Sequence, residues 1–266
     1  MIYKHHMEVL AITIFRPIFL TIITFFLIVI FCFLGFKRRQ SRLKKFTEDQ
    51  IDISFFSGSV LGLLALILSF TFNIAFSRYD ARRQVIVQEA NEIGTTILRT
   101  NLYPDSIARQ MKDEFKKYID ARIAYYDAGT DMTRVSETLS EATKHSDSIW
   151  KIITLQTRDP TSLIRSNQMI PAMNDVIDIV TTREKLRTAY IPDSMLAVLV
   201  ILIIICSFMI GFNIKNKRTV PVIAFVFAFI ISITIFLILD LVHSTFGLIT
   251  QDAAEQSITA LKSLIP

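Results

Sequence analysis

Four long apolar segments dominate the pattern of hydrophobic and polar positions along this chain. They cover residues 17–36, 53–76, 194–213 and 219–239, and none contains a charged side chain. A helix of twenty residues is about 30 Å long, which matches the hydrocarbon core of a bilayer. The pattern therefore predicts four membrane-spanning helices. The first segment is too long for a signal peptide and no small-residue cleavage pattern follows it, so we expect it to remain as a span.

A segment of different character, residues 78–192, separates the second and third apolar segments. It contains 17 Lys and Arg and 16 Asp and Glu, and its apolar positions recur at helical period. Breaks at 101–106, 128–131 and 158–161 predict helices near 78–101, 105–127, 131–157 and 161–190. No breaker precedes the first of these, so one long helix is expected to leave the membrane.

The expected fold is all-α, a polytopic membrane protein with four transmembrane helices and a helical soluble domain inserted between spans 2 and 3. Its expected parts are transmembrane helices 1 and 2 with a short basic loop (1–77), the soluble helical domain (78–192), a transmembrane hairpin (193–240) and a short amphipathic C-terminal tail (241–266), which is suited to docking on the helical domain. We also expect Gly58 and Gly62 to let neighbouring helices approach the second span closely.

Composition excludes several classes of protein. Hydrophobic residues make up 52% of the 266 residues, with 21 Phe and only 20% charged residues, which excludes a purely soluble enzyme. The net charge of +5 comes from scattered residues with no basic face beside aromatic side chains, so no nucleic-acid partner is expected. Both cysteines, Cys32 and Cys206, lie in apolar segments and cannot form a disulfide framework.

No catalytic constellation is recognisable. The four histidines are scattered without ligand spacing, and seven glycines form no phosphate-binding loop. We therefore expect no enzyme activity, no catalytic residue, no metal and no cofactor.

The second span is the most informative element, because polar residues interrupt its apolar sequence. Steps of three or four residues place six of its residues on one helical stripe: Gly62, Leu66, Ser69, Phe70, Asn73 and Ser77. One interpretation is a pore-lining face, narrow and apolar towards Leu66 and Phe70 and wetter at Asn73 and Ser77. The other is ordinary helix packing, with the hydroxyls bonded to their own backbone, and spacing alone favours it.

Charged residues mark two ends of the spans. Arg78 and Arg82 follow the second span and can either snorkel to the interface or attract anions to a pore mouth, and chemistry alone favours snorkelling. Asp240 ends the fourth span and is typical of an interfacial stop.

The numbers of basic residues on the two sides of the predicted spans barely distinguish the two orientations in the membrane. The two short connections, 37–45 and 215–218, carry nine Lys and Arg, against eight near the opposite ends of the spans. The positive-inside rule therefore weakly favours a cytoplasmic location for the short connections.

Three segments resemble the bestrophin family of ion channels, and particularly its bacterial bestrophin-like membrane proteins. Leu61 through Arg82 resembles the family's pore helix, although this chain is one residue shorter between the arginines. Leu98 to Pro104 resembles the end of its first soluble helix, with Tyr118 in the core of the next. The segment with Asp240, Phe246 and Gly247 is similar to an acidic and Pro-Phe-Gly element, with Thr245 in the proline position.

The resemblance implies a homo-oligomer, a pentamer in that family, whose second-span helices line a central pore. Gly62, Leu66 and Phe70 would then form the neck, where an apolar constriction favours weakly hydrated ions and aromatic edges modestly favour anions. It implies a multi-pass protein of the inner membrane whose partners are the lipid bilayer, further copies of itself and inorganic ions. It also places the helical domain in the cytoplasm, against the charge count.

We therefore expect a bestrophin-like oligomeric channel that conducts anions. The alternative is a membrane sensor or scaffold without a pore, whose helical domain binds a ligand or partner. The acidic residues after the last span are too sparse for a calcium site. The sequence alone does not determine ion selectivity, the gating stimulus, the side that residues 78–192 face or the subunit number.

Overall fold

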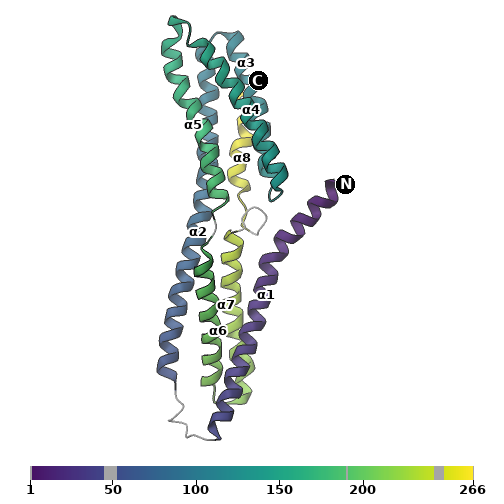
Figure 1. The fold of residues 1–266 in the computed structure, drawn as a ribbon, viewed down its shortest axis with the longest axis vertical. Coiled ribbons are helices and arrows are strands. Elements are labelled where there is room, and N and C mark those ends of the chain that lie inside the picture. Colours follow the sequence, from purple (N-terminus) through teal and green to yellow (C-terminus); the bar gives the residue numbers. More distant parts are fainter. Residues whose placement is uncertain (1, 45–52, 190, 243–248, 266) are drawn as a thin grey trace. The chain divides into compact units, whose positions relative to one another are not determined.

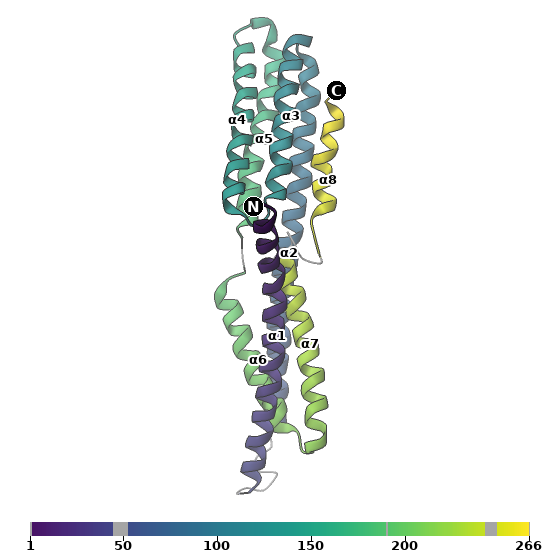
Figure 2. The same ribbon diagram turned by 90° about the vertical axis from the view of Figure 1, so that its right-hand side faces the viewer.

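The computed structural model describes residues 2–44, 53–189, 191–242 and 249–265, and all its regular elements are helical (Figures 1 and 2). This confirms the all-α fold class. The helices are α1 (Ile2–Leu43), α2 (Ser54–Arg99), α3 (Asp105–Asp127), α4 (Met132–Gln156), α5 (Leu163–Arg187), α6 (Asp193–Asn213), α7 (Val220–Val242) and α8 (Asp252–Ala260), with short 3-10 turns at Thr100–Leu102, Pro160–Ser162, Lys217–Thr219 and Leu261–Leu264.

Among the described residues, four helices are long and apolar enough to cross a membrane, as the sequence predicts. The candidate spans are Pro17–Leu43, Phe55–Leu102, Asp193–Asn213 and Lys217–Val242. Helix α2 is a single helix of 46 residues, which confirms that the second span continues without a break into the first helix of the soluble segment. Helix α1 is longer than its apolar segment and contains Pro17 within it.

The chain forms two compact units. The first, here called the membrane unit, contains residues 1–77 and 190–243, and the second, the helical unit, contains residues 78–189 and 244–266. Helix α2 contributes its first part to the membrane unit and its second part to the helical unit.

A close contact between α1 and α6 holds the membrane unit together. A Cβ atom added at Gly211 would lie 1.9 Å from the carbonyl oxygen of Cys32, and one at Gly35 would lie 2.0 Å from that of Phe208. Only glycine permits this approach of two helix backbones. Around the contact, α1, α2, α6 and α7 share an apolar core that includes Ile28, Cys32, Leu64, Cys206 and Ala228.

The expectation for Gly58 and Gly62 is wrong for the isolated protomer. Among the described residues, a Cβ atom at either position would meet nothing within 4 Å. The close backbone contact lies instead at Gly35 and Gly211, because the faces of α1 and α6 that carry these glycines meet each other.

The helical unit is built from the second part of α2 with α3, α4, α5 and α8 around one apolar core. Local capping sets the helix starts. The Asp131 carboxylate accepts hydrogen bonds from the backbone N–H groups of Thr133 and Arg134, at 3.1 and 3.2 Å, and so begins α4. Helix α8 adds Ala254 and Ile258 to the core.

Candidate pore face and buried charge network

The six predicted pore residues all lie on one face of α2, and that face is exposed in the protomer. Leu66 is 49% exposed and Phe70 is 52% exposed, and the other four are exposed as well. The opposite face of the helix is buried, with Leu64 at 2% and Thr71 at 0% exposure. Helix α2 therefore packs into its own protomer with one face and leaves the predicted stripe uncovered.

The polar side chains of α2 differ between these two faces. On the buried face, Thr71 donates to the Ile67 carbonyl oxygen at 2.8 Å, and Ser57 donates to that of Ile53 at 2.9 Å. On the exposed face, Ser59 donates to the Phe55 carbonyl oxygen at 3.4 Å, whereas in the part of the chain that the structure describes the side chains of Ser69 and Asn73 donate no hydrogen bond. The packing interpretation, with hydroxyls bonded to their own backbone, thus describes Thr71 and Ser57 but does not describe Ser69.

The other predicted site residues differ in how deeply they are buried. Arg78 and Arg82 continue along α2 and are partly exposed. Asp240 is buried, near the end of α7. Phe246 and Gly247, from the same predicted C-terminal motif, lie outside the described residues.

A buried charge network, absent from the sequence predictions, occupies the helical unit. Glu89 of α2 is paired with two arginines: Nε of Arg122 lies 2.5 Å from one carboxylate oxygen, and Nη1 of Arg183 lies 2.7 Å from the other. The other Arg183 nitrogen, Nη2, is paired with Glu255 of α8. Glu89 and Arg122 are completely buried. Four helices are therefore joined through alternating charges.

An aromatic ring supports the cationic side of this network. The guanidinium of Arg122 lies 4.5 Å from the ring centroid of Tyr125, and that of Arg183 lies 5.1 Å from it. The Tyr125 hydroxyl donates to Glu184 at 2.8 Å. Burial raises the pKa of Glu255 to about 7, although the neighbouring Arg183 acts in the opposite direction.

One signal in the sequence could have indicated this network. Glu89 and Arg122 occupy core positions of the helical pattern, since Glu89 lies between the buried Ile86 and Ile93, and Arg122 between Tyr118 and Tyr125. A single charge on an apolar stripe calls for a buried partner. The identity of that partner depends on which helices meet, which periodicity does not give.

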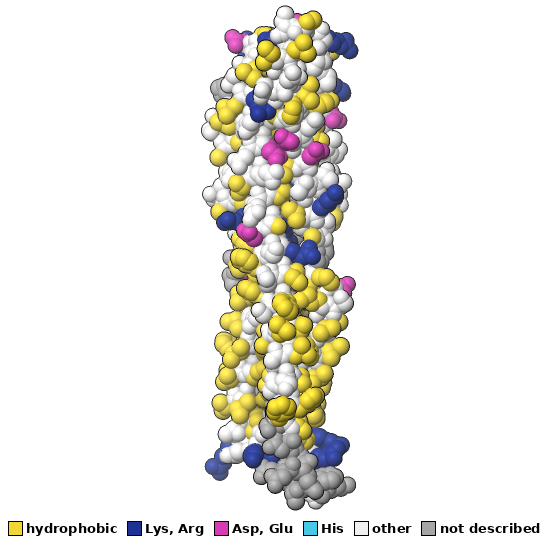
Figure 3. Space-filling model, turned by 90° about the vertical axis from the view of Figure 1, so that its left-hand side faces the viewer, with side chains coloured by type: hydrophobic (Ala, Val, Ile, Leu, Met, Phe, Trp, Pro, Cys, Tyr) yellow, Lys and Arg dark blue, Asp and Glu magenta, His cyan; other side chains and the backbone are white. Residues whose placement is uncertain are grey.

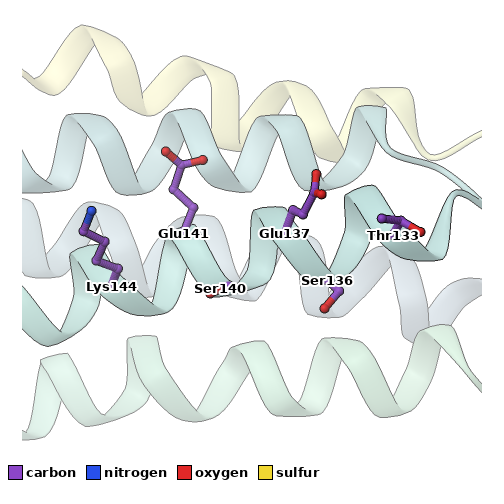
Figure 4. A pocket seen from close by; sticks show the side chains of 6 residues that line it. All are labelled: Thr133, Ser136, Glu137, Ser140, Glu141 and Lys144. Atoms are coloured by element: carbon purple, nitrogen blue, oxygen red, sulfur yellow. The ribbon is translucent and has the colours of Figure 1, made fainter. Parts of the chain in front are cut away.

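The surface of the helical unit has a depression at α4, but side chains from different helices do not converge there as they do in the buried charge network. A depression of about 790 Å³ is lined by Thr133, Ser136, Glu137, Ser140, Glu141 and Lys144. Figure 4 shows that all six project from the one helix. A ligand site is normally enclosed by groups from several elements. In the searched part of the chain, no group of three or more His, Cys, Asp or Glu residues could hold a metal ion.

The chain was compared with protein families, curated sequences and solved structures. The family model described as "Bestrophin-like domain" matches residues 23–244. No curated protein sequence matches the chain. A crystal structure of a bacterial bestrophin homologue from Klebsiella pneumoniae is similar in fold, with a TM-score of 0.65, 15% identity and coverage of 92% of this chain and 99% of that one. A mutant of that homologue gives a TM-score of 0.68 at 14% identity, covering 93% and 98%.

Proposed function

This chain belongs to the bestrophin-like family, and we propose that copies of it assemble into an oligomeric ion channel with α2 of each copy lining a central pore. The observation that supports this most directly is the exposed stripe on α2. Polar side chains at membrane depth are costly against lipid, and they face a bundle interior or water. Ser69 and Asn73 obtain such surroundings when further copies of α2 close around a common axis.

The proposed assembly is a ring of five, the number that the family resemblance implies. In this ring, Gly62, Leu66 and Phe70 form an apolar neck, and Asn73 and Ser77 line a wetter section. Gly62 has no side chain to narrow the path, so the neck is widest there. An apolar neck conducts ions only when water fills it, and it favours ions that lose their hydration shell readily.

The proposed conducted ions are anions. No Asp or Glu lies between Ile53 and Tyr79, so no carboxylate of this segment opposes an anion along the neck. The edge of the Phe70 ring bears partial positive charge. Arg78 and Arg82 add cationic charge further along the same helix.

We place the protein in the inner membrane, as a multi-pass protein whose partners are the bilayer, further copies of itself and inorganic ions. Conduction of this kind needs no catalytic group, and we propose no enzymatic reaction. Figure 3 displays the apolar surface that the bilayer would cover on the membrane unit.

Two measurements on the purified full-length protein test the proposal. Native mass spectrometry or averaged electron-microscope views should give about five subunits around an axis. Planar-bilayer recording should then give anion currents, with a higher unit conductance in Phe70→Ala because the neck widens. The matched control is Phe229→Ala, an equally exposed Phe on α7, which should leave conductance unchanged.

A monomer or a dimer without an axial path would contradict the pore. So would electrical silence of a correctly assembled ring across salts and pH. Either result would favour the alternative function, a sensor or scaffold in which the helical unit binds a ligand or partner.

A further inference from the structure

A concentration of exposed cations lies at one end of the membrane unit. Lys37, Arg38 and Lys44 are exposed near the end of α1, and Lys217 and Arg218 are exposed in the turn between α6 and α7. These five residues are called the basic rim below. Over the whole of both connections, 37–52 and 214–219, the sequence contains nine basic residues against three acidic ones.

The two segments that form the basic rim are held together by specific contacts. Arg39 is buried, and its Nη1 donates to the carbonyl oxygen of Phe212 near the end of α6 at 3.3 Å. One turn earlier, the backbones of α1 and α6 touch at Gly35 and Gly211. The Asn213 amide also donates to the Ser57 hydroxyl of α2 at 2.6 Å. The cations of α1 and of the α6–α7 turn are therefore fixed at the same end of this unit.

The basic rim directly adjoins apolar surface. Leu34 is exposed one helical turn before Arg38, and Val222 is exposed one turn after Arg218. One turn of helix rises about 5.4 Å, which is the depth of a headgroup layer beside the hydrocarbon core. Figure 3 shows this arrangement on the membrane unit, with hydrophobic side chains over its face and Lys and Arg gathered at its end.

We propose that the basic rim binds the phosphodiester headgroups of anionic phospholipids. Lys and Arg have long apolar stems that lie along hydrocarbon while their cationic ends reach the headgroup layer. Each cation at a negatively charged membrane surface contributes attraction, and clusters of four or more select anionic over zwitterionic lipids. A bilayer lipid fits better than a soluble anion, because its acyl chains cover the adjoining Leu34 and Val222 while its phosphate meets the cations.

The experiment uses delipidated full-length protein in detergent and native mass spectrometry. Phosphatidylglycerol and phosphatidylcholine with the same acyl chains are added separately, and bound lipids are counted. The wild type should bind phosphatidylglycerol at least about tenfold better than phosphatidylcholine. The variant K37Q/R38Q/K217Q/R218Q should reduce this preference to about twofold or less.

The matched control, K116Q/K144Q/K151Q/R158Q, removes four exposed cations of the helical unit and should keep the wild-type preference. The double variant K37Q/R38Q should give an intermediate preference, with an unchanged thermal unfolding midpoint as evidence of folding. A third arm adds millimolar glycerophosphoglycerol, the free headgroup, which should not displace the bound lipid.

Any of three results from the lipid counts would overturn the proposal: equal binding of both lipids to the wild type, an unchanged preference in the fourfold variant, or an equal loss in the control. Displacement by the free headgroup would also overturn it, since it would indicate a site for soluble phosphates. The lipid proposal is independent of the channel, because it requires neither a current nor a ring.

Discussion

Glu89 is the residue on which the buried charge network of the helical unit is centred. Its carboxylate neutralises Arg122 and Arg183, and Glu89 and Arg122 are wholly buried. Glu89→Gln would leave a buried excess of positive charge, which is costly because neither guanidinium can lose its proton. We expect the free energy of unfolding to fall by about 3–5 kcal/mol. The measurement is thermal or denaturant unfolding of the full-length protein in detergent.

Glu137→Gln provides the control for Glu89→Gln, because Glu137 is an exposed carboxylate on α4. This change should alter the free energy of unfolding by less than about 0.5 kcal/mol. The double variant Glu89→Met/Arg122→Met removes one charge of each sign and should recover part of the lost stability. Equal effects of Glu89→Gln and Glu137→Gln would show that the network contributes nothing to stability.

Gly211 gives a second prediction at the residue scale. A Cβ atom there would lie 1.9 Å from the Cys32 carbonyl oxygen, so Gly211→Ala must push α1 and α6 apart. We expect a loss of about 1–3 kcal/mol in the free energy of unfolding. Gly62→Ala in the same assay should be neutral or stabilising, since alanine favours helix and meets open space in the protomer. Equal destabilisation by both changes would contradict the close contact.

At the scale of single residues, the sequence predicts periodicity well and tertiary partners poorly. The stripe from Gly62 to Ser77 follows from helical spacing, and the structure places all six residues on one exposed face. The pairing of Glu89 with Arg122 and Arg183 does not follow, because it joins three helices far apart in the sequence. The close contact at Gly35 and Gly211 does not follow either, because it depends on which faces of α1 and α6 meet.

Helix α8 is the element whose docking should respond most to pH. Its Glu255 is buried, and it faces Arg183 of α5, Glu89 of α2 and Arg122 of α3. Tyr126 and Asp127 of α3 and Asp252 of α8 line a second surface depression together with Glu255. Burial raises the pKa of Glu255 to about 7 from an ordinary value of 4.5, so the docked helix binds a proton more tightly than the undocked one.

The sign of the pH effect follows from this difference. Docking of α8 should be tightest below about pH 4.5 and should weaken as the pH rises towards 7, by roughly 3 kcal/mol at most. The measurement is hydrogen exchange of the α8 amides at pH 5.5 and 8.5, corrected for intrinsic rates. The protection should be greater at pH 5.5 in the wild type and equal at both values in Glu255→Gln. Greater protection at pH 8.5 would show that the ion pair with Arg183 outweighs burial.

The elements themselves were largely predictable, because their ends depend on local chemistry. The predicted helix 105–127 coincides with α3, whose start follows Pro104, and the Asp131 cap begins α4 one residue inside the prediction. Helix α1 extends beyond its uncharged apolar segment in both directions, because residues 2–16 and 37–43 contain charged side chains but no glycine or proline that would end a helix.

At the scale of the whole molecule, the proposed assembly places the stripe of α2 against water. Cysteine labelling can test this environment, because the native Cys32 and Cys206 are free and completely buried in the protomer. The labelling of a cysteine introduced elsewhere can therefore be measured with little background from the native thiols. A thiol reacts as its thiolate, which forms readily in water and poorly against hydrocarbon.

Asn73→Cys and Phe229→Cys separate a pore face from a lipid face at similar exposure in the protomer. In membranes, a charged, membrane-impermeant thiol reagent should modify Asn73→Cys rapidly, because the pore supplies both water and access. It should modify Phe229→Cys at least about tenfold more slowly, since lipid excludes the reagent and suppresses the thiolate. If Asn73→Cys were as unreactive as Phe229→Cys in a protein of confirmed ring stoichiometry, the stripe would be a dry helix interface. The conducting path would then have to lie elsewhere in the assembly.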